Sequence, residues 1–277
     1  MATLIEMPIS EGVDREIARR LELAIAAAQA AGGVTLQFFQ TDRLGTQTKG
    51  DGSPVTEADR GAEQTLRAAI EESFPDDAIL GEEFGDKAGS SGYRWILDPI
   101  DGTISFVHGV PLYGTLVGVL RGDEPIAGVV HMPALGETVY AARGGGAWWV
   151  PRPGQDARPA AVTATSTLAE ATLVTTALEY FTQMDADGAF LDITRACART
   201  RGWSDCYAHV LLATGRCDAV VEPTIKPWDV APLPVILVEL GGGFSDWTGE
   251  PRIDGGHAIA TNGRLHAELL DLVRPHA

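Results

Sequence analysis

The sequence has only three cysteines, Cys197, Cys206 and Cys217. Their number is odd and no CxxC pair occurs, so neither a disulfide framework nor a zinc site is indicated. We therefore expect free thiols in a reducing compartment and a cytoplasmic protein. The sequence also lacks an apolar run of about 18 residues, so no membrane span is expected. The alanine-rich stretch 21–34 lacks a basic start and is a poor candidate for a signal peptide.

Positive charge is scarce. The 277 residues include 21 Lys and Arg against 38 Asp and Glu, which gives a formal net charge of -17. No basic stripe is visible, so nucleic acid is not an expected partner. An acidic protein can still bind an anionic substrate if metal cations invert the local field. The hydrophobic content of 45% is typical of a globular protein with a packed core.

The hydrophobic pattern predicts helices and strands in alternation. A helix is expected over 12–31, ending at the "AGG" of 31–33, and Thr56 is expected to cap a helix that runs to Ser73. Further expected elements are two strands ending in acids within 78–104, an antiparallel meander over 110–150, a linker at 151–160, and alternating strands and helices from there on. This order favours a layered α/β fold, with an N-terminal half at 1–155 and a C-terminal half at 156–277. Pro234 indicates that the helix expected over 229–240 begins late or is kinked.

Acidic residues recur at or beside the ends of the predicted strands. They are Asp59, Glu82, Glu83, Asp98, Asp101 and Asp229. Carboxylate oxygens are the ligands that a hard cation such as Mg²⁺ prefers. In "WILDPIDGT", Asp98 and Asp101 are placed to converge on one point, with the carbonyl of Ile100 facing the same point. Gly102 and Thr103 would open a helix, and free N–H groups at a helix start bind phosphate.

Each acidic stretch also has a plainer interpretation. Asp101 and Gly102 form a common turn pair, Asp229 is a candidate helix cap, and Glu82 with Glu83 suits a solvated loop. Their joint occurrence favours a shared metal site. An EF-hand is excluded because its D-x-[DN]-x-[DN]-G pattern is absent. A haloacid dehalogenase nucleophile requires DxDGT, whereas the spacing here is DxxDGT, so a covalent aspartyl-phosphate is not expected.

These motifs resemble the inositol monophosphatase family of Mg²⁺-dependent phosphatases. The matching stretches are "VTEAD" at 55–59, "GEE" at 81–83, "WILDPIDGT" at 95–103 and "KPWDVA" at 226–231, and the resemblance spans about 14–272. It implies an αβαβα sandwich of the inositol monophosphatase and sugar phosphatase type. It also implies a homodimer, which is the common state in the family, a small phosphate ester as substrate, and two or three Mg²⁺ ions.

The resemblance also assigns roles to residues. The implied metal ligands are Glu82, Asp98, the Ile100 carbonyl, Asp101, Asp229 and, for a further ion, Asp59. The N–H groups of Gly102 and Thr103 would hold the phosphate, and Lys49 would lie near the site in a mobile loop. Thr103 with Glu82 or Asp59 would position or deprotonate a water that attacks phosphorus directly.

The substrate is indicated by residues that would touch the alcohol. Ser105 stands where many inositol-type members have Asn, and it resembles the histidinol-phosphate phosphatase branch, as does "PLYGTLVGVL". Asp205 lies 17 residues before Glu222, and an acid there suits the ammonium group of histidinol phosphate. Asp101 and Asp229 would line the same substrate site. The plainer interpretation is that Ser204 or Asp205 only caps a helix starting at Cys206.

Several alternatives remain open. One is an inositol-1-phosphate phosphatase, or a broad-specificity sugar or nucleotide phosphatase. Another is a metal-binding regulator that has kept the fold without turnover. Lys226 and Trp228 are candidates for the rim of the site. His108 and His209 receive no role, because a lone histidine is more often structural.

Overall fold

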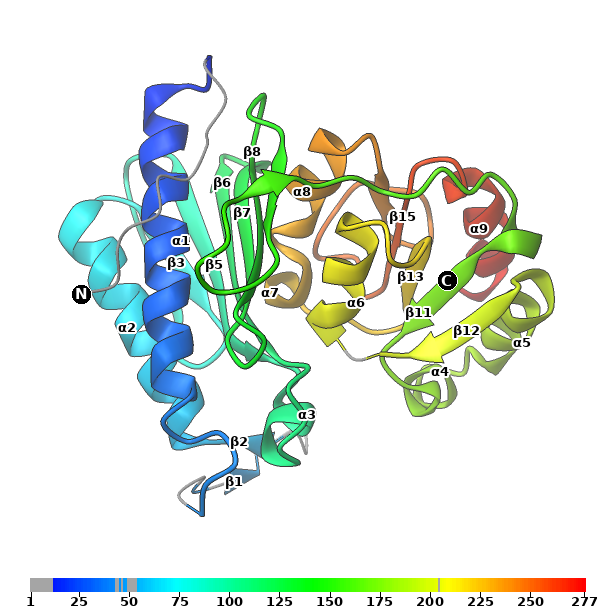
Figure 1. Cartoon of the computed structure of the whole chain (residues 1–277), viewed down its shortest axis with the longest axis horizontal. Helices are drawn as coiled ribbons and strands as arrows, with labels where there is room; N and C mark the ends of the chain where they lie inside the picture. Colours follow the sequence, from blue (N-terminus) through cyan, green and yellow to red (C-terminus); the bar gives the residue numbers. More distant parts are fainter. Residues whose placement is uncertain (1–11, 43–44, 46, 49–53, 204) are drawn as a thin grey trace.

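The computed structural model describes residues 12–277 except 43–44, 46, 49–53 and 204. Its layers follow one another in the order helix, sheet, helix, sheet, helix (Figure 1). The αβαβα sandwich predicted from the sequence is therefore confirmed. Within the described residues, no helix has both the length and the apolar character needed to cross a membrane.

The first sheet has eight strands in the order β10-β9-β8-β7-β6-β5-β3-β4. They are β3 (Ala78–Gly81), β4 (Gly85–Lys87), β5 (Tyr93–Asp101), β6 (Gly114–Arg121), β7 (Glu124–Met132), β8 (Glu137–Ala142), β9 (Ala147–Val150) and β10 (Arg158–Pro159). Strands β6 to β9 form the predicted antiparallel meander, and β3 pairs with β5 in parallel. Helices cover both faces, which explains why β6 reads as one apolar run.

The second sheet has five strands in the order β12-β11-β13-β15-β14. They are β11 (Thr172–Thr175), β12 (Arg199–Gly202), β13 (Ala219–Glu222), β14 (Gly243–Ser245) and β15 (Ala258–Thr261). Strand β11 lies parallel to both of its neighbours, while β15 is antiparallel to β13 and β14. Apart from these two sheets, β1 (Gln47–Thr48) pairs antiparallel with β2 (Pro54–Val55).

The helices form the other three layers (Figure 1). They are α1 (Arg15–Thr35), α2 (Glu57–Ser73), α3 (Thr103–Val107), α4 (Leu178–Gln183), α5 (Asp187–Ala196), α6 (Asp205–Ala213), α7 (Pro227–Val230), α8 (Leu233–Glu239) and α9 (His266–Val273), with short 3₁₀ turns at Leu168–Glu170 and Arg274–His276. Helices α1 and α2 pack on the outer face of the first sheet. Helices α6, α7 and α8 lie between the sheets, and α5 and α9 cover the far face of the second.

The start of α2 confirms one local prediction, and the end of α1 corrects another. Thr56 caps α2, because its hydroxyl accepts from the Ala58 N–H at 3.1 Å. Helix α1 does not end at "AGG" but continues to Thr35. Gly32 is needed there for close packing, since a Cβ on it would lie 2.8 Å from the His131 ring. The close contact with His131, and not the end of a helix, therefore explains why a glycine is present at position 32.

The helix expected over 229–240 is broken, as Pro234 predicts. It forms α7 and α8, separated by Ala231 and Pro232. Pro234 lies in the first turn of α8, where a missing N–H costs no helical hydrogen bond. The break presses the backbone of Pro232 onto strand β7 at Gly128, where an added Cβ would lie 2.4 Å from the Pro232 carbonyl oxygen.

Gly128→Ala is therefore expected to destabilise the fold by about 1–3 kcal/mol, because the backbone that follows Asp229 would have to move. Gly33→Ala is the matched control. Gly33 is exposed in α1 with nothing within 4 Å of its missing Cβ, so alanine should stabilise by up to about 1 kcal/mol. Denaturant unfolding of the two variants measures both values. An unchanged midpoint for Gly128→Ala would contradict the close contact.

Candidate active site

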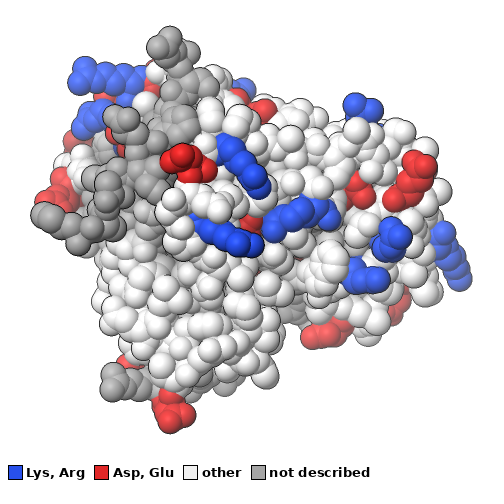
Figure 2. All heavy atoms as spheres, viewed as in Figure 1, with Lys and Arg blue, Asp and Glu red and all other residues white. Residues whose placement is uncertain are grey.

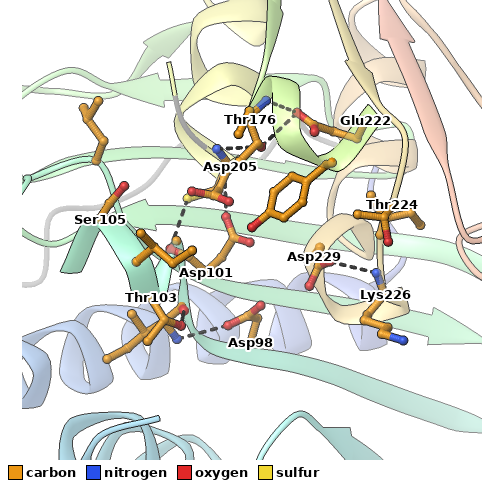
Figure 3. Close-up of a pocket in the computed structure, with 18 of the residues that line it drawn as sticks. Asp98, Asp101, Thr103, Ser105, Thr176, Asp205, Glu222, Thr224, Lys226 and Asp229 are labelled. Atoms are coloured by element: carbon orange, nitrogen blue, oxygen red, sulfur yellow. Dashed lines mark hydrogen bonds between the residues drawn. The ribbon is translucent and has the colours of Figure 1, made fainter. Parts of the chain in front are cut away.

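A cavity of about 820 Å³ lies between the two halves of the sandwich. The end of β5, helix α3, the β11–α4 connection, α6, the end of β13 and α7 all contribute to its wall (Figure 3). The acidic residues that line it are Glu82, Asp98, Asp101, Glu179, Asp205, Glu222 and Asp229. Lys226 is the one lysine or arginine among its described lining. The cavity therefore concentrates negative charge inside an already acidic protein.

The "DPIDGT" turn at the end of β5 is held by its own hydrogen bonds. The Ile100 N–H donates to the Asp98 carboxylate at 3.0 Å, and the Thr103 hydroxyl donates to the Ile100 carbonyl at 3.0 Å. The pairing of β5 with β6 shifts register between Asp98 and Asp101. Gly102 then adopts a left-handed φ of 82°, which favours glycine. This geometry lets both aspartates face the cavity.

Three acids from distant parts of the chain meet here. Asp98, Asp101 and Asp229 each offer one carboxylate oxygen, and these oxygens lie within 4.8 Å of one another (Figure 3). The Lys226 N–H donates to Asp229 at 2.7 Å, so Asp229 also caps α7. The plainer interpretation of Asp229 as a helix cap and its place in the acid cluster are therefore compatible.

The cluster is electrostatically unfavourable when every member is ionised. Burial raises the pKa of Asp98 well above its usual value, and the charges of Glu82, Asp101 and Asp229 raise it further. Burial and the charges of Asp205 and Asp229 do the same to Asp101. Burial raises the pKa of Asp229 to about 7. Three converging carboxylates, of which those of Asp98 and Asp101 are buried and that of Asp229 is half-buried, are a donor set that fits a hard divalent cation.

Glu82 is positioned by a residue that the sequence analysis missed. Glu63 of α2 is fully buried, and its carboxylate accepts from the N–H groups of Glu83 at 2.7 Å and Phe84 at 3.2 Å. The Nε of Arg67 donates to a carboxylate oxygen of Glu63 at 2.7 Å, so Arg67 balances the charge of Glu63. Glu63 thus holds the turn after β3 on which Glu82 lies. In sequence, Glu63 and Arg67 look like an ordinary exposed pair one helical turn apart, so no signal distinguished them.

Asp59 lies outside the residues that line the cavity but close to this turn. One of its carboxylate oxygens accepts from the Thr56 N–H at 2.8 Å. The other is buried and has no hydrogen-bond partner among the described residues. Burial raises the pKa of Asp59 to about 6, and the charges of Glu83 and Glu82 contribute. A buried oxygen without a partner fits a cation, but the role of Asp59 stays a prediction.

Two predicted substrate residues, Asp205 of α6 and Glu222 at the end of β13, lie in a part of the cavity wall that we call the substrate wall (Figure 3). The other two, Asp101 and Asp229, belong to the acid cluster. Asp205 adjoins the "DPIDGT" turn, since a Cβ on Gly102 would lie 3.0 Å from its carboxylate. The Glu222 carboxylate accepts from the Thr176 N–H at 2.9 Å and from its hydroxyl at 3.0 Å. The Asp205 N–H donates to the Thr176 hydroxyl at 3.1 Å. The next residue, Cys206, donates its N–H to Asp101 at 2.5 Å. The start of α6 therefore links the acid cluster to the substrate wall.

Asp205 has a strained backbone. Its φ is 24°, which is uncommon for a residue with a side chain. The plainer interpretation placed it as a cap before a helix at Cys206, whereas α6 begins at Asp205 itself. Ser204 lies outside the described residues. A strained acid in a binding cavity is the kind of feature that marks a functional position.

Other lining residues complete the cavity. Ser105, Lys226 and Trp228 lie in its wall as expected, while Lys49 falls outside the described residues. Tyr180 was missed because the short helix α4 was not predicted. Burial raises the pKa of Tyr180 to about 12, and the charge of Asp205 contributes.

The two histidines without an assigned role differ in their positions. His209 lines the cavity, and burial lowers its pKa to about 3, so its ring is neutral. His108 is exposed, and its Nδ1 lies 2.9 Å from the Ile104 carbonyl.

The raised pKa values predict how pH affects the metal-free protein. In the unfolded chain these carboxyls titrate near pH 4, and in the folded chain Asp229 titrates near 7. Because the folded state binds these protons more tightly, protonation stabilises the fold. This stabilisation is fully present below about pH 4 and is lost as the pH rises through the pKa values of the folded state. We expect the melting temperature in EDTA to fall by several degrees from pH 5 to pH 8.

The same melts in Mg²⁺ at pH 8 should recover the loss. Asp98→Asn should flatten the pH dependence in EDTA, whereas the exposed Asp123→Asn should not. Equal pH dependence in both variants would show that general surface charge, not the cluster, is responsible.

Comparison with known proteins gives consistent matches along nearly the whole chain. A model of the inositol monophosphatase family matches residues 16–276. A histidinol-phosphatase of Chlorobaculum parvum is 39% identical over 251 residues, which cover 90% of this chain and 95% of the relative. One from Streptomyces coelicolor is 38% identical over 254 residues, with coverage of 90% and 95%. The structure of an inositol monophosphatase from Zymomonas mobilis has a TM-score of 0.81 and 31% identity, over 94% of this chain and 99% of that one.

Proposed function

The chain belongs to the inositol monophosphatase family of phosphatases, and we propose that it hydrolyses L-histidinol phosphate to L-histidinol and inorganic phosphate. The assignment of this substrate rests on the position of Asp205, an acid in the substrate wall close to Glu222 and Asp101. The relatives named histidinol-phosphatase support the same substrate. The cavity of about 820 Å³ is within the size range of small-molecule sites.

Metal dependence is typical of the family, and the acid cluster fits it. The residues that would hold two or three Mg²⁺ ions are Glu82, Asp98, the Ile100 carbonyl, Asp101, Asp229 and Asp59. Such ions supply positive charge that neutralises phosphate oxygens and lowers the pKa of water.

Groups of the chain itself would bind the phosphate, orient the attacking water and take up its proton. The Thr103 hydroxyl donates to the Ile100 carbonyl, so its oxygen is left to accept a hydrogen bond from an attacking water. Glu82 or Asp59 would take up the proton of that water. The N–H groups of Gly102 and Thr103 precede or begin α3, where they lack helical partners and would hold the phosphate. Attack would occur directly at phosphorus, without a covalent enzyme intermediate.

The substrate wall would recognise the alcohol. Burial and the nearby charge of Asp205 raise the pKa of Glu222 well above its usual value. An ammonium group between Asp205 and Glu222 would relieve this repulsion through charge-assisted hydrogen bonds, each worth about 1.5–3 kcal/mol. An uncharged inositol offers no such compensation for a desolvated acid.

The alternatives have narrower support. Inositol 1-phosphate is favoured by the structural likeness to the Zymomonas mobilis enzyme, and a broad-specificity sugar or nucleotide phosphatase stays a weaker option. A metal-binding regulator without turnover is disfavoured, because Glu82 and Thr103 line the same cavity as the cluster of Asp98, Asp101 and Asp229. We further propose a homodimer and a division into halves at 1–155 and 156–277, in which the second half supplies Asp205, Glu222 and Asp229.

A side-by-side kinetic comparison of histidinol phosphate and inositol 1-phosphate tests the substrate. We expect kcat/KM to favour histidinol phosphate by about 100-fold, which corresponds to about 2.7 kcal/mol. Equal values or a preference for inositol 1-phosphate would reject the proposal. Absence of Mg²⁺-dependent phosphate release from either ester would favour the regulator.

Replacement of Mg²⁺ by Ca²⁺ is expected to inhibit the enzyme by at least about 10-fold. Ca²⁺ is larger and accepts irregular coordination by six to eight oxygens, whereas Mg²⁺ requires near-octahedral geometry. Phosphate release is measured in Mg²⁺ alone, in Ca²⁺ alone, and at constant Mg²⁺ with increasing Ca²⁺. Full activity in Ca²⁺ alone would contradict the expected cation selectivity.

A further inference from the structure

A second cavity, of about 490 Å³, opens on another part of the surface. Its lining comes from the start of β8, from β9, from the segment between β9 and β10, from the start of β10, and from α6 and the residues that follow it. The lining residues that matter here are Arg152, Arg158, Arg216, Trp149, Tyr207 and Glu137. We call this cavity the arginine pocket. Figure 2, viewed from the same side as Figure 1, shows lysine and arginine side chains gathered near the middle of the face that it presents.

An aromatic side chain organises the arginines of this pocket. The guanidinium carbon of Arg158 lies 4.0 Å from the centre of the Trp149 ring, and that of Arg216 lies 5.1 Å from it. Arg216 also lies 5.7 Å from the Tyr207 ring. Cation–π contact holds guanidinium groups in place while leaving their edges able to donate hydrogen bonds.

The pocket has an excess of positive charge. Glu137 is buried and accepts from Trp149 Nε1 at 2.7 Å and from Arg216 at 2.5 Å, so it compensates one arginine. Arg152 and Arg158 are exposed, and neither has a carboxylate partner among the described residues. Two arginines without acid partners in one cavity are notable in a chain with a net charge of -17.

The arginine pocket is distinct from the catalytic cavity, although α6 lines both. Asp205, Cys206 and His209 face the acidic catalytic cavity, whereas Tyr207 faces the arginine pocket. The two cavities have opposite charge. Without metal ions the catalytic cavity repels anions, while the arginine pocket attracts them.

We propose that the arginine pocket binds a small anion with two or more linked phosphate groups. Guanidinium edges match phosphate oxygens through paired hydrogen bonds, and two uncompensated arginines call for more than one negative charge. The cavity volume limits the ligand to a small molecule or the phosphate end of one. The site is independent of the substrate proposed above.

The test is a calorimetric titration of the metal-free protein in EDTA with inorganic tripolyphosphate, at low and constant ionic strength. We expect one saturable site per chain. Arg152→Ala/Arg158→Ala should weaken binding by at least about 10-fold. The matched control is Arg195→Ala/Arg264→Ala, which removes two exposed arginines elsewhere and should leave binding unchanged. Circular dichroism melts verify that both variants fold.

Absence of saturable binding would overturn the proposal. An equal loss in the two double variants would also overturn it, because it would show nonspecific charge attraction. Citrate serves to separate phosphate from carboxylate ligands. Tighter binding of tripolyphosphate than of citrate supports a phosphate site, whereas citrate binding of equal or greater affinity would reject the assigned ligand class.

Discussion

Asp98→Asn is expected to lower Mg²⁺-dependent kcat/KM by at least about 10³-fold, which corresponds to about 4 kcal/mol of transition-state stabilisation. Asp98 is buried and faces Asp101 and Asp229, with one oxygen of each within 4.8 Å of the others. Asparagine keeps the shape and one acceptor oxygen but removes the charge that a divalent cation requires. The loss should therefore occur without unfolding.

The same change should make the metal-free protein more stable. Burial and the charges of Glu82, Asp101 and Asp229 raise the pKa of Asp98, so its ionised form is unfavourable at neutral pH. A neutral amide removes that repulsion, and we expect a higher melting temperature in EDTA at pH 8. Near-wild-type activity would contradict the metal assignment. Lower stability together with lost activity would attribute the defect to folding instead.

Asp205→Asn is expected to reduce kcat/KM for histidinol phosphate by about 10- to 100-fold, with less than about 3-fold change for inositol 1-phosphate. The range follows from the loss of one charge-assisted contact of about 1.5–3 kcal/mol. Asparagine is preferred to alanine as the replacement because it tolerates the φ of 24° at this position. The variant therefore changes charge without adding backbone strain.

Thr224→Ser is a control for general disturbance of the cavity, since Thr224 also lines the cavity but carries no charge. Its effect should be small and similar for both esters. Equal losses for the two esters in Asp205→Asn would show that Asp205 acts through the fold or through the Cys206 contact with Asp101. The ammonium partner would then have to be another residue.

The sequence predicted those parts of the site that a local motif encodes. The spacing of Asp98 and Asp101 and the following Gly102 defines a turn whose geometry is local, and the structure places both acids at the cavity as expected. Thr56 and the α2 that it caps were predicted for the same reason. The alternation of strand and helix patterns predicted a layered α/β fold, whereas the αβαβα order of the layers came from the resemblance to the inositol monophosphatase family.

What escaped prediction depends on contacts between distant residues. Glu63 is buried only because α2 packs against the first sheet and meets the turn that carries Glu82. Gly32 resembled a helix end because its close contact with His131 is not visible in the sequence. Tyr180 belongs to a helix of six residues, too short for a periodic pattern to reveal.

The most direct test of the acid cluster is an anomalous difference map from crystals soaked in Mn²⁺, which accepts the same oxygen ligands as Mg²⁺. The account predicts a strong peak between Asp98, Asp101 and Asp229, within coordination distance of all three carboxylates. A well-ordered crystal at pH 8 with no peak at these three carboxylates would contradict it.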